Sequence, residues 1–178
     1  MNVMERLYQI LEEEQMWDGE ILLKRHEYLC SAGQVEPRLF FVKEGSLRVF
    51  VTQQEEEHTI RLGYPGSFLA ALDSFIAGQP TGFHIQAIKS ASLYFIDGER
   101  YRAFLQEDEE RRRLWQQAME LLILQQLERE CDLLIEPPRE RYLRVLKRSP
   151  QLFQHVPNRY IASYLRMTPE TFSRIKKS

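Results

Sequence analysis

The period of the apolar residues changes at Asp97-Gly98, and this change limits the fold more than any other feature of the chain. Before it, short apolar runs alternate with glycines, and Glu44-Gly45 has the pattern of a hairpin turn. These runs lie at 21–23, 28–29, 39–42, 47–51, 59–62, 84–88 and 92–96. After it, apolar residues recur at the spacing of a helix. The chain is therefore predicted to be α+β, with an antiparallel β-roll of the jelly-roll type followed by helices.

The longest predicted helix runs from Asp108 to about Ile135 and is apolar on more than one side. One apolar stripe follows its length: Leu114, Ala118, Leu121, Leu124, Leu127 and Cys131. Trp115, Met119 and Leu122 widen the apolar surface beyond that stripe. A helix of this kind needs more than one neighbour, so we expect the β-roll to cover one face and a second subunit to cover the other. The alternative is one intrachain core face with scattered exposed residues.

Two prolines mark a domain boundary after this helix. Pro137-Pro138 cannot continue the helix, and a further amphipathic segment follows at 139–148. The expected organisation is a β-roll domain at 1–107, opened by a short helix, then the long helix at 108–136, and a helical C-terminal domain at 137–178.

The segment Val156–Lys177 has the pattern of a helix-turn-helix. Ala162 lies on the apolar face of the first helix and is small enough to let a second helix cross closely. Thr168 is a suitable N-cap, and Pro169 suits the first position of that second helix. Arg166 stands in the turn, where a positive φ is expected and glycine is common.

The exposed side of this motif carries residue types suited to base edges and phosphates. The candidates are Arg159, Thr168, Glu170, Thr171, Ser173, Arg174, Lys176 and Lys177. Residues 139–178 hold ten Lys/Arg and two Asp/Glu, a balance of +8, whereas the other 138 residues hold fourteen and twenty-four, a balance of −10. An acidic body repels DNA, so contact is predicted at the C-terminal end alone. The alternative is a solvated basic helix surface.

The composition, 43% hydrophobic and 28% charged, is that of an ordinary soluble globular protein. The start is acidic and amphipathic, unlike a signal peptide, and no apolar run reaches transmembrane length. Cys30 and Cys131 stand far apart without metal-ligand spacing. We therefore expect a cytoplasmic protein with two reduced thiols, no metal and no membrane partner.

Four segments in this order resemble the Crp/Fnr family of bacterial transcription regulators. They are Tyr28–Gln34, Phe40–Val49, Gly63–Phe68 and Ile161–Ile175. The first two are similar to the family's early strands and glycine turns. The third is similar to the entry of its ligand-binding cassette, and the fourth to its recognition unit. The resemblance covers nearly the whole chain.

The resemblance implies a sequence-specific DNA-binding transcriptional regulator and not an enzyme. It implies a homodimer joined along the long helix, which places two recognition helices on a palindromic operator with half-sites roughly 34 Å apart. By this resemblance Arg174 reads guanine and Glu170 reads cytosine, whereas Arg159, Lys176 and Lys177 hold phosphates. RNA polymerase and an unidentified small-molecule effector are further candidate partners.

The family's ligand cassette uses Gly-Glu for the ribose of cyclic AMP and an Arg for its phosphate. Here Ala70-Ala71 and Thr81 stand at those places, and no Arg or Lys occurs from Tyr64 to Ile88. A buried anion needs a cation and backbone donors. We therefore expect that cyclic AMP does not bind in the family's usual manner.

A pocket for an uncharged ligand is one interpretation of the altered cassette. By position, its lining is expected from Ala70, Ala71, Ser74, Phe75, Thr81, Phe83 and His84. The alternative is a roll filled by its own side chains. The chain lacks four thiolates for an iron–sulfur cluster, and haem ligation by His26, His58 or His84 stays open. No cofactor is predicted.

Two rival classes fit the sequence less well. A metal-dependent cupin enzyme needs a His-x-His pair, whereas His26, His58, His84 and His155 stand singly. The second rival is a ligand-binding β-roll sensor that acts on a partner protein rather than on DNA. Binding to a protein does not require a net charge of +8 in residues 139–178 beside a polar helix face. This feature therefore favours DNA as the partner.

Overall fold

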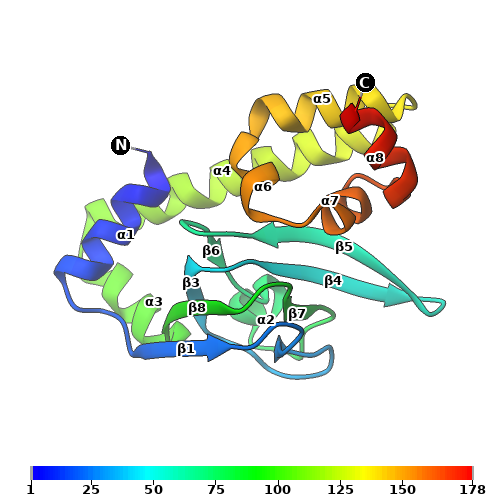
Figure 1. Ribbon diagram of the computed structural model, residues 1–178. Coiled ribbons are helices and arrows are strands. Elements are labelled where there is room, and N and C mark those ends of the chain that lie inside the picture. Colours follow the sequence, from blue (N-terminus) through cyan, green and yellow to red (C-terminus); the bar gives the residue numbers. More distant parts are fainter. Residues whose placement is uncertain (1, 178) are drawn as a thin grey trace.

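The computed structural model describes residues 2–177 as a β-roll with helices on both sides of it in the chain (Figure 1). A first helix, α1 (Val3–Glu13), precedes the strands. The elements of the roll are β1 (Gly19–Leu23), β2 (Tyr28–Cys30), β3 (Leu39–Glu44), β4 (Leu47–Gln53), β5 (Glu56–Gly63), β6 (Phe68–Leu69), α2 (Leu72–Ala77), β7 (His84–Ala87) and β8 (Ala91–Ile96). The helices that follow are α3 (Gly98–Gln106), α4 (Glu109–Leu134), α5 (Pro138–Arg148), α6 (Pro150–His155), α7 (Asn158–Tyr164) and α8 (Pro169–Lys177). The predicted α+β class is confirmed.

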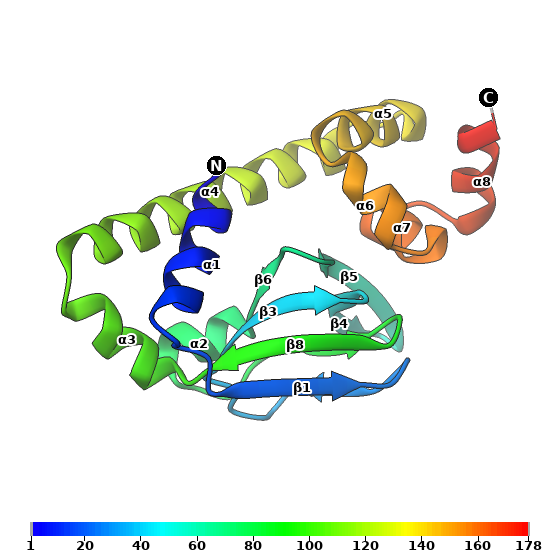
Figure 2. The same cartoon turned by 60° about the vertical axis from the view of Figure 1, so that its left-hand side comes forward.

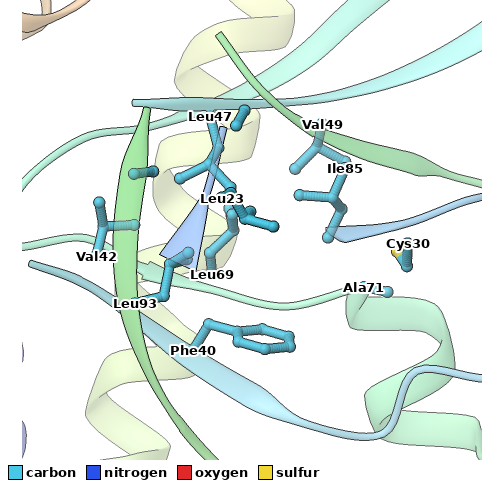
Figure 3. Packing of buried hydrophobic residues seen from close by; sticks show 12 residues of the cluster. Leu23, Cys30, Phe40, Val42, Leu47, Val49, Leu69, Ala71, Ile85 and Leu93 are labelled. Atoms are coloured by element: carbon cyan, nitrogen blue, oxygen red, sulfur yellow. The ribbon is translucent and has the colours of Figure 1, made fainter. Parts of the chain in front are cut away.

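The roll consists of two four-stranded antiparallel sheets, ordered β1-β8-β3-β6 and β2-β7-β4-β5. Both sheets contribute fully buried side chains to one apolar core, among them Phe40, Leu47, Ile85 and Leu93 (Figure 3). Successive strand side chains point to opposite faces, so the apolar positions of each run collect in the space between the sheets. The short spaced runs of the sequence are thereby explained.

The sequence pattern did not predict β6, α2 or α6, which have two, six and six residues. Elements this short carry too few residues to show a period. Their neighbours hold them instead: β6 pairs with β3 through Phe40 opposite Leu69 and Phe41 opposite Phe68. Tertiary contacts therefore define these segments.

Helices α1 and α3 pack with the N-terminal half of α4 in a second apolar cluster. A capping box begins α1, because Asn2 accepts a hydrogen bond from the Glu5 N–H and the Glu5 carboxylate accepts one from the Asn2 N–H. Leu7 of α1 is 1% exposed. Trp115 of α4 packs edge-on against Tyr101 of α3, with ring centroids 5.1 Å apart. The first half of α4 is thus anchored to the body of the protein.

The apolar stripe predicted along α4 divides between two faces of the helix. Leu114, Ala118 and Leu122 are buried within the chain. Leu114 belongs to the cluster with α1, and Ala118 and Leu122 face the roll. Leu114 and Ala118 therefore belong to the intrachain core, which corrects their place in the expected subunit interface. Leu121, half-buried, lies at the border.

Several apolar residues in the C-terminal half of α4 are exposed. Leu124, Leu127 and Leu134 are 59%, 51% and 82% exposed, and Cys131 is exposed as well. Their spacing alternates between three and four residues, which is the a/d pattern of a two-stranded coiled coil. We call this set, Leu124, Leu127, Cys131 and Leu134, the exposed α4 seam.

Gly45 lies in the turn between β3 and β4, where the backbone packs too closely for a side chain. Its φ is +80°, and a Cβ there comes within 2.1 Å of the Ser90 carbonyl oxygen. We expect Gly45→Ala to lower the free energy of unfolding by about 3 kcal/mol or more, since strain and a backbone clash add. Gly33→Ala is the matched control: its φ is +89°, but its Cβ meets nothing within 4 Å, so about 1 kcal/mol is expected. Urea unfolding measures both, and equal losses contradict the clash argument.

Candidate nucleic-acid interface

Helices α7 and α8 form a helix-turn-helix with the local features that the sequence predicts. Arg166 in the turn has a φ of +54°. The Met167 N–H donates to the Ala162 carbonyl at 3.0 Å, which closes the end of α7. Thr168 Oγ1 then accepts from the Thr171 N–H at 3.2 Å and begins α8 as its N-cap. The turn accommodates an arginine at a position of positive φ.

A small aromatic core fixes α8 against the helices before it. Phe172 is 1% exposed and packs edge-on against Tyr142 of α5, with centroids 5.5 Å apart. Phe153 of α6 stacks on the Phe172 ring, with ring centroids 6.4 Å apart. Ala162 of α7 is fully buried and lies in the same cluster. The polar side of α8 is therefore turned outwards.

The structure brings most of the predicted contact residues of α8 to one face. Glu170, Ser173, Arg174 and Lys177 line one shallow open hollow with Pro169. Among residues 2–177, no carboxylate forms an ion pair with Arg174, Lys176 or Lys177. These basic groups are available to an external anion.

The other candidates make contacts within the protein. Thr168 and Thr171 are joined at the N-cap, with their hydroxyl oxygens 3.1 Å apart. The Lys176 ammonium donates to Asn158 Oδ1 at 3.3 Å, and the Arg159 guanidinium lies 4.5 Å from the Tyr160 ring centroid. The two threonines support the start of α8, while Arg159 and Lys176 stay exposed at its edge.

Helix α8 lies at the end of the molecule, away from the sheets, with α7 beside β5 (Figure 2). Ser163 of α7 donates from its hydroxyl to Thr59 Oγ1 of β5 at 3.0 Å. Arg129 of α4 donates to the carbonyl oxygen of the same Thr59 at 3.0 Å. In the turn, the Arg166 guanidinium lies 2.9 Å from His58 Nδ1. One strand of the roll thus holds the helix-turn-helix in place.

A buried carboxylate fixes the angle between α4 and α5. Asp132 is 1% exposed, and its two oxygens lie 2.8 Å from Arg144 Nε and 2.7 Å from Arg148 Nη2. Sequence patterns did not single out Asp132, although an acidic residue within the apolar end of a helix, followed by an arginine-rich segment, is a usable signal. These two ion pairs connect the end of α4 to α5.

The cassette of the roll is arranged differently from the expected pocket. A cavity of about 130 Å³ lies between the roll, α1 and α4, and of the seven predicted residues only Ala70 and Phe83 line it. The other five are placed elsewhere. Ala71, Ser74, Phe75 and Thr81 are buried, and His84 stacks on Phe50 with centroids 4.9 Å apart. The predicted lining is thus corrected, because Ala71 and Phe75 pack in the apolar cores and Ser74 accepts a hydrogen bond from the Glu36 N–H instead.

Asp73 occupies the hydrogen-bond donors of the cassette turn. Its carboxylate accepts from Thr81 Oγ1 at 2.7 Å and from the N–H groups of Gly82 and Ser74, each at 2.8 Å. Burial raises the pKa of Asp73, but these hydrogen bonds outweigh burial and leave the pKa below its usual value. The Asp73 carboxylate therefore already occupies the donors of Thr81, Gly82 and Ser74.

Arg61 of β5 is a cavity residue that sequence reasoning missed. It lines the 130 Å³ cavity, although it lies three positions before the segment in which a cation was sought. The signal available was a lone arginine within an apolar strand, Thr59–Leu62. Arg61 thus gives the cavity a positively charged lining residue, which the cassette segment from Tyr64 to Ile88 lacks.

Within residues 2–177, no three His, Cys, Asp or Glu side chains gather in a way that suits a metal ion. In the same residues, no helix is both long and apolar enough to cross a membrane.

A β-roll joined through one long helix to a helix-turn-helix defines a two-domain class of proteins. The model of the cyclic nucleotide-binding domain matches residues 20–108 of the chain. The chain belongs to the cyclic nucleotide-binding domain family. No curated protein sequence matches it significantly.

Solved structures share the fold over nearly the whole chain. A CooA mutant from Carboxydothermus hydrogenoformans is 18% identical, with a TM-score of 0.71, and the match covers 99% of this chain and 83% of that one. The c-di-GMP responsive regulator CLP from Xanthomonas campestris is 17% identical, with a TM-score of 0.70 and coverage of 96% and 90%. The catabolite activator protein of Thermus thermophilus is 19% identical, with a TM-score of 0.58 and coverage of 96% and 81%. The resemblance to the Crp/Fnr fold is confirmed.

Asp132 provides a test of how the C-terminal domain is attached. We expect Asp132→Ala to lower the free energy of unfolding by about 1–3 kcal/mol, because it removes a buried partner from two arginines that keep some solvent contact. Glu128→Ala is the control, since Glu128 also pairs with Arg148, at 3.4 Å, but is 54% exposed. That variant should lose less than about 0.5 kcal/mol in urea unfolding. Equal effects contradict the role of burial.

Proposed function

We propose that the protein is a sequence-specific, DNA-binding transcriptional regulator of the Crp/Fnr type. The observation that carries this proposal is the outward face of α8, where Glu170, Ser173 and Arg174 lie together on a capped, well-packed helix. The basic groups of that face have no carboxylate partner among residues 2–177. Direct base recognition needs such side chains on a helix that enters the major groove.

Each side chain has a role in this proposal. Arg174 donates two hydrogen bonds to guanine, and Glu170 accepts from cytosine. Lys176, Lys177 and Arg159 neutralise phosphates and set the orientation of the helix. Ser173 lines the same hollow as Glu170 and Arg174 and contacts a base edge or a phosphate, according to the sequence bound.

The regulator acts as a homodimer in this proposal, joined along the exposed α4 seam. Three leucines more than half exposed at coiled-coil spacing support a helix partner of the same kind. Two copies related by a two-fold axis read a palindromic operator whose half-sites are roughly 34 Å apart. RNA polymerase is a further proposed partner of the DNA-bound form.

Cyclic AMP is not the proposed effector. Ala70-Ala71 and Thr81 offer no charged contact, and Asp73 already accepts the hydrogen bonds of Gly82 and Ser74. A phosphate brought to this turn meets a carboxylate of like charge. No metal, haem or other cofactor is part of the proposal.

Arg174→Ala tests base reading. After selection of bound sites from random duplex DNA, we expect the variant to lose about 1–3 kcal/mol on the preferred site and to accept other bases at one position per half-site. Lys177→Ala is the comparison: it should weaken binding to all sequences alike and reduce the salt dependence by about one counterion. Unchanged site preference in Arg174→Ala argues against its role. Absence of salt-dependent DNA binding by the wild type favours a sensor that acts on a protein partner.

Leu127→Glu tests the dimer. An unpaired carboxylate in the seam should weaken association by about 3 kcal/mol or more, so that sedimentation velocity shows monomers. Leu22→Glu, at a 75% exposed leucine of β1, should leave the dimer intact. A wild-type protein that sediments as a monomer at micromolar concentration contradicts the proposal.

Cys131 gives an independent readout of the same seam. In a parallel dimer, a short bis-maleimide should link Cys131 to its counterpart, and Cys131→Ser should abolish the link. Cys30 does not compete, because it is 3% exposed and burial raises its pKa to about 11.

A further inference from the structure

The 130 Å³ cavity between the roll and α4 has an almost entirely apolar wall. Leu69, Ala70 and Phe83 line it from the roll, while Met119 and Leu122 line it from α4. Engineered apolar cavities on the order of 150 Å³ stay dry and bind benzene. The space therefore suits an apolar group of about the size of one aromatic ring.

Arg61 is the one basic side chain that the described residues contribute to that wall. Among residues 2–177, no carboxylate lies within ion-pair distance of its guanidinium. Arg61 also lines the adjoining groove with Tyr64 and Tyr164. Burial lowers the pKa of Arg61, although these two tyrosines act in the opposite direction. A cation held this way costs stability unless an anion joins it.

The backbone of β5 aims Arg61 at the cavity through an irregularity in the strand. Val49 of β4 pairs with Arg61, but the next residue, Phe50, pairs with Thr59, so that Ile60 is an extra residue. Such a β-bulge changes the direction of side chains and is frequent near functional sites. As a result, the adjacent residues Ile60 and Arg61 both line the cavity. The roll accepts an irregular strand at the position that presents the cation.

We propose that this cavity binds a small monocarboxylic acid, whose apolar body fills the space and whose carboxylate pairs with Arg61. One guanidinium compensates one negative charge and offers a bidentate geometry that matches a carboxylate. A phosphate monoester brings a second charge into an apolar wall, which disfavours it. The site lies outside the cassette turn and takes its cation from β5. The inference goes beyond the proposed DNA-binding function and does not depend on it.

The carboxylate site has a direct structural route to the helix-turn-helix. Thr59, two residues before Arg61, contacts both Ser163 of α7 and Arg129 of α4. Ligand contacts to Arg61 therefore act on the strand that holds α7. Occupancy of the cavity is in this way tied to the position of α8.

Calorimetry and thermal unfolding of the full chain without DNA test the proposal, with benzoate as the probe. Benzyl alcohol serves as the neutral counterpart, and cyclic AMP as the nucleotide. We expect benzoate to bind and raise Tm, benzyl alcohol to bind more weakly, and cyclic AMP to have no effect. Binding by cyclic AMP alone overturns the proposal, as does equal affinity for benzoate and its neutral counterpart.

Arg61→Met separates binding from folding. The variant should bind benzoate about tenfold or more weakly, while its affinity for benzyl alcohol stays within about twofold. Because the substitution removes a half-buried cation that has no carboxylate partner among residues 2–177, Tm without ligand should rise by about 2 °C or more. A Tm that falls assigns Arg61 a structural role and overturns the proposal.

Two more variants control for charge and for space. Lys147→Gln removes an exposed positive charge from α5 and should leave benzoate binding unchanged; a matching loss there means unspecific attraction and overturns the proposal. Ala70→Leu fills the cavity and should abolish binding of both probes. Retained binding in Ala70→Leu places the ligand elsewhere. DNA binding is assayed separately, so failure of either proposal leaves the other measurable.

Discussion

The burial of one half of α4 and the exposure of its other half is the constraint on which the rest of the structure depends. Leu114 and Ala118 pack within the chain, whereas Leu124 and Leu127 are more than half exposed in the protomer. A helix of this length extends about 39 Å, so it passes beyond the body that buries its first half. It carries the C-terminal domain on its far end (Figure 2). The same rod therefore separates the roll from α8 and leaves an apolar surface suited to a second rod.

Thr59 is where the roll, the long helix and the helix-turn-helix meet. It is 1% exposed, and it accepts hydrogen bonds from Ser163 and Arg129. Asp132 provides a second attachment, through its ion pairs with Arg144 and Arg148 of α5. The roll also packs against the C-terminal helices through Leu62 and Ile88, and Arg166 of the turn contacts His58 of β5. A shift of β5 is thus expected to move the C-terminal domain with it.

The sequence predicted those parts that depend on period and local chemistry. The strand runs, the long helix, the Thr168 cap and the unusual turn at Arg166 all follow from neighbouring residues. The division of α4 into two faces did not follow, because period alone does not say which neighbour covers Leu114 and which leaves Leu124 free. The cavity cation was missed for a related reason. A single extra residue in β5, Ile60, changes the direction in which the Arg61 side chain points. Such a change depends on how β5 pairs with β4, and the sequence of one strand alone does not show it.

The proposed site at Arg61 lies apart from the cassette turn, and the two places differ in charge. In the cassette turn, Asp73 supplies a negative charge that holds Thr81 and Gly82 without any ligand. The turn is then complete in the empty protein, and its stability no longer depends on a bound anion. The uncompensated charge lies instead on β5, the strand that contacts α7. In the proposed site, an anion paired with Arg61 would act on the strand that also contacts α7, the helix before α8.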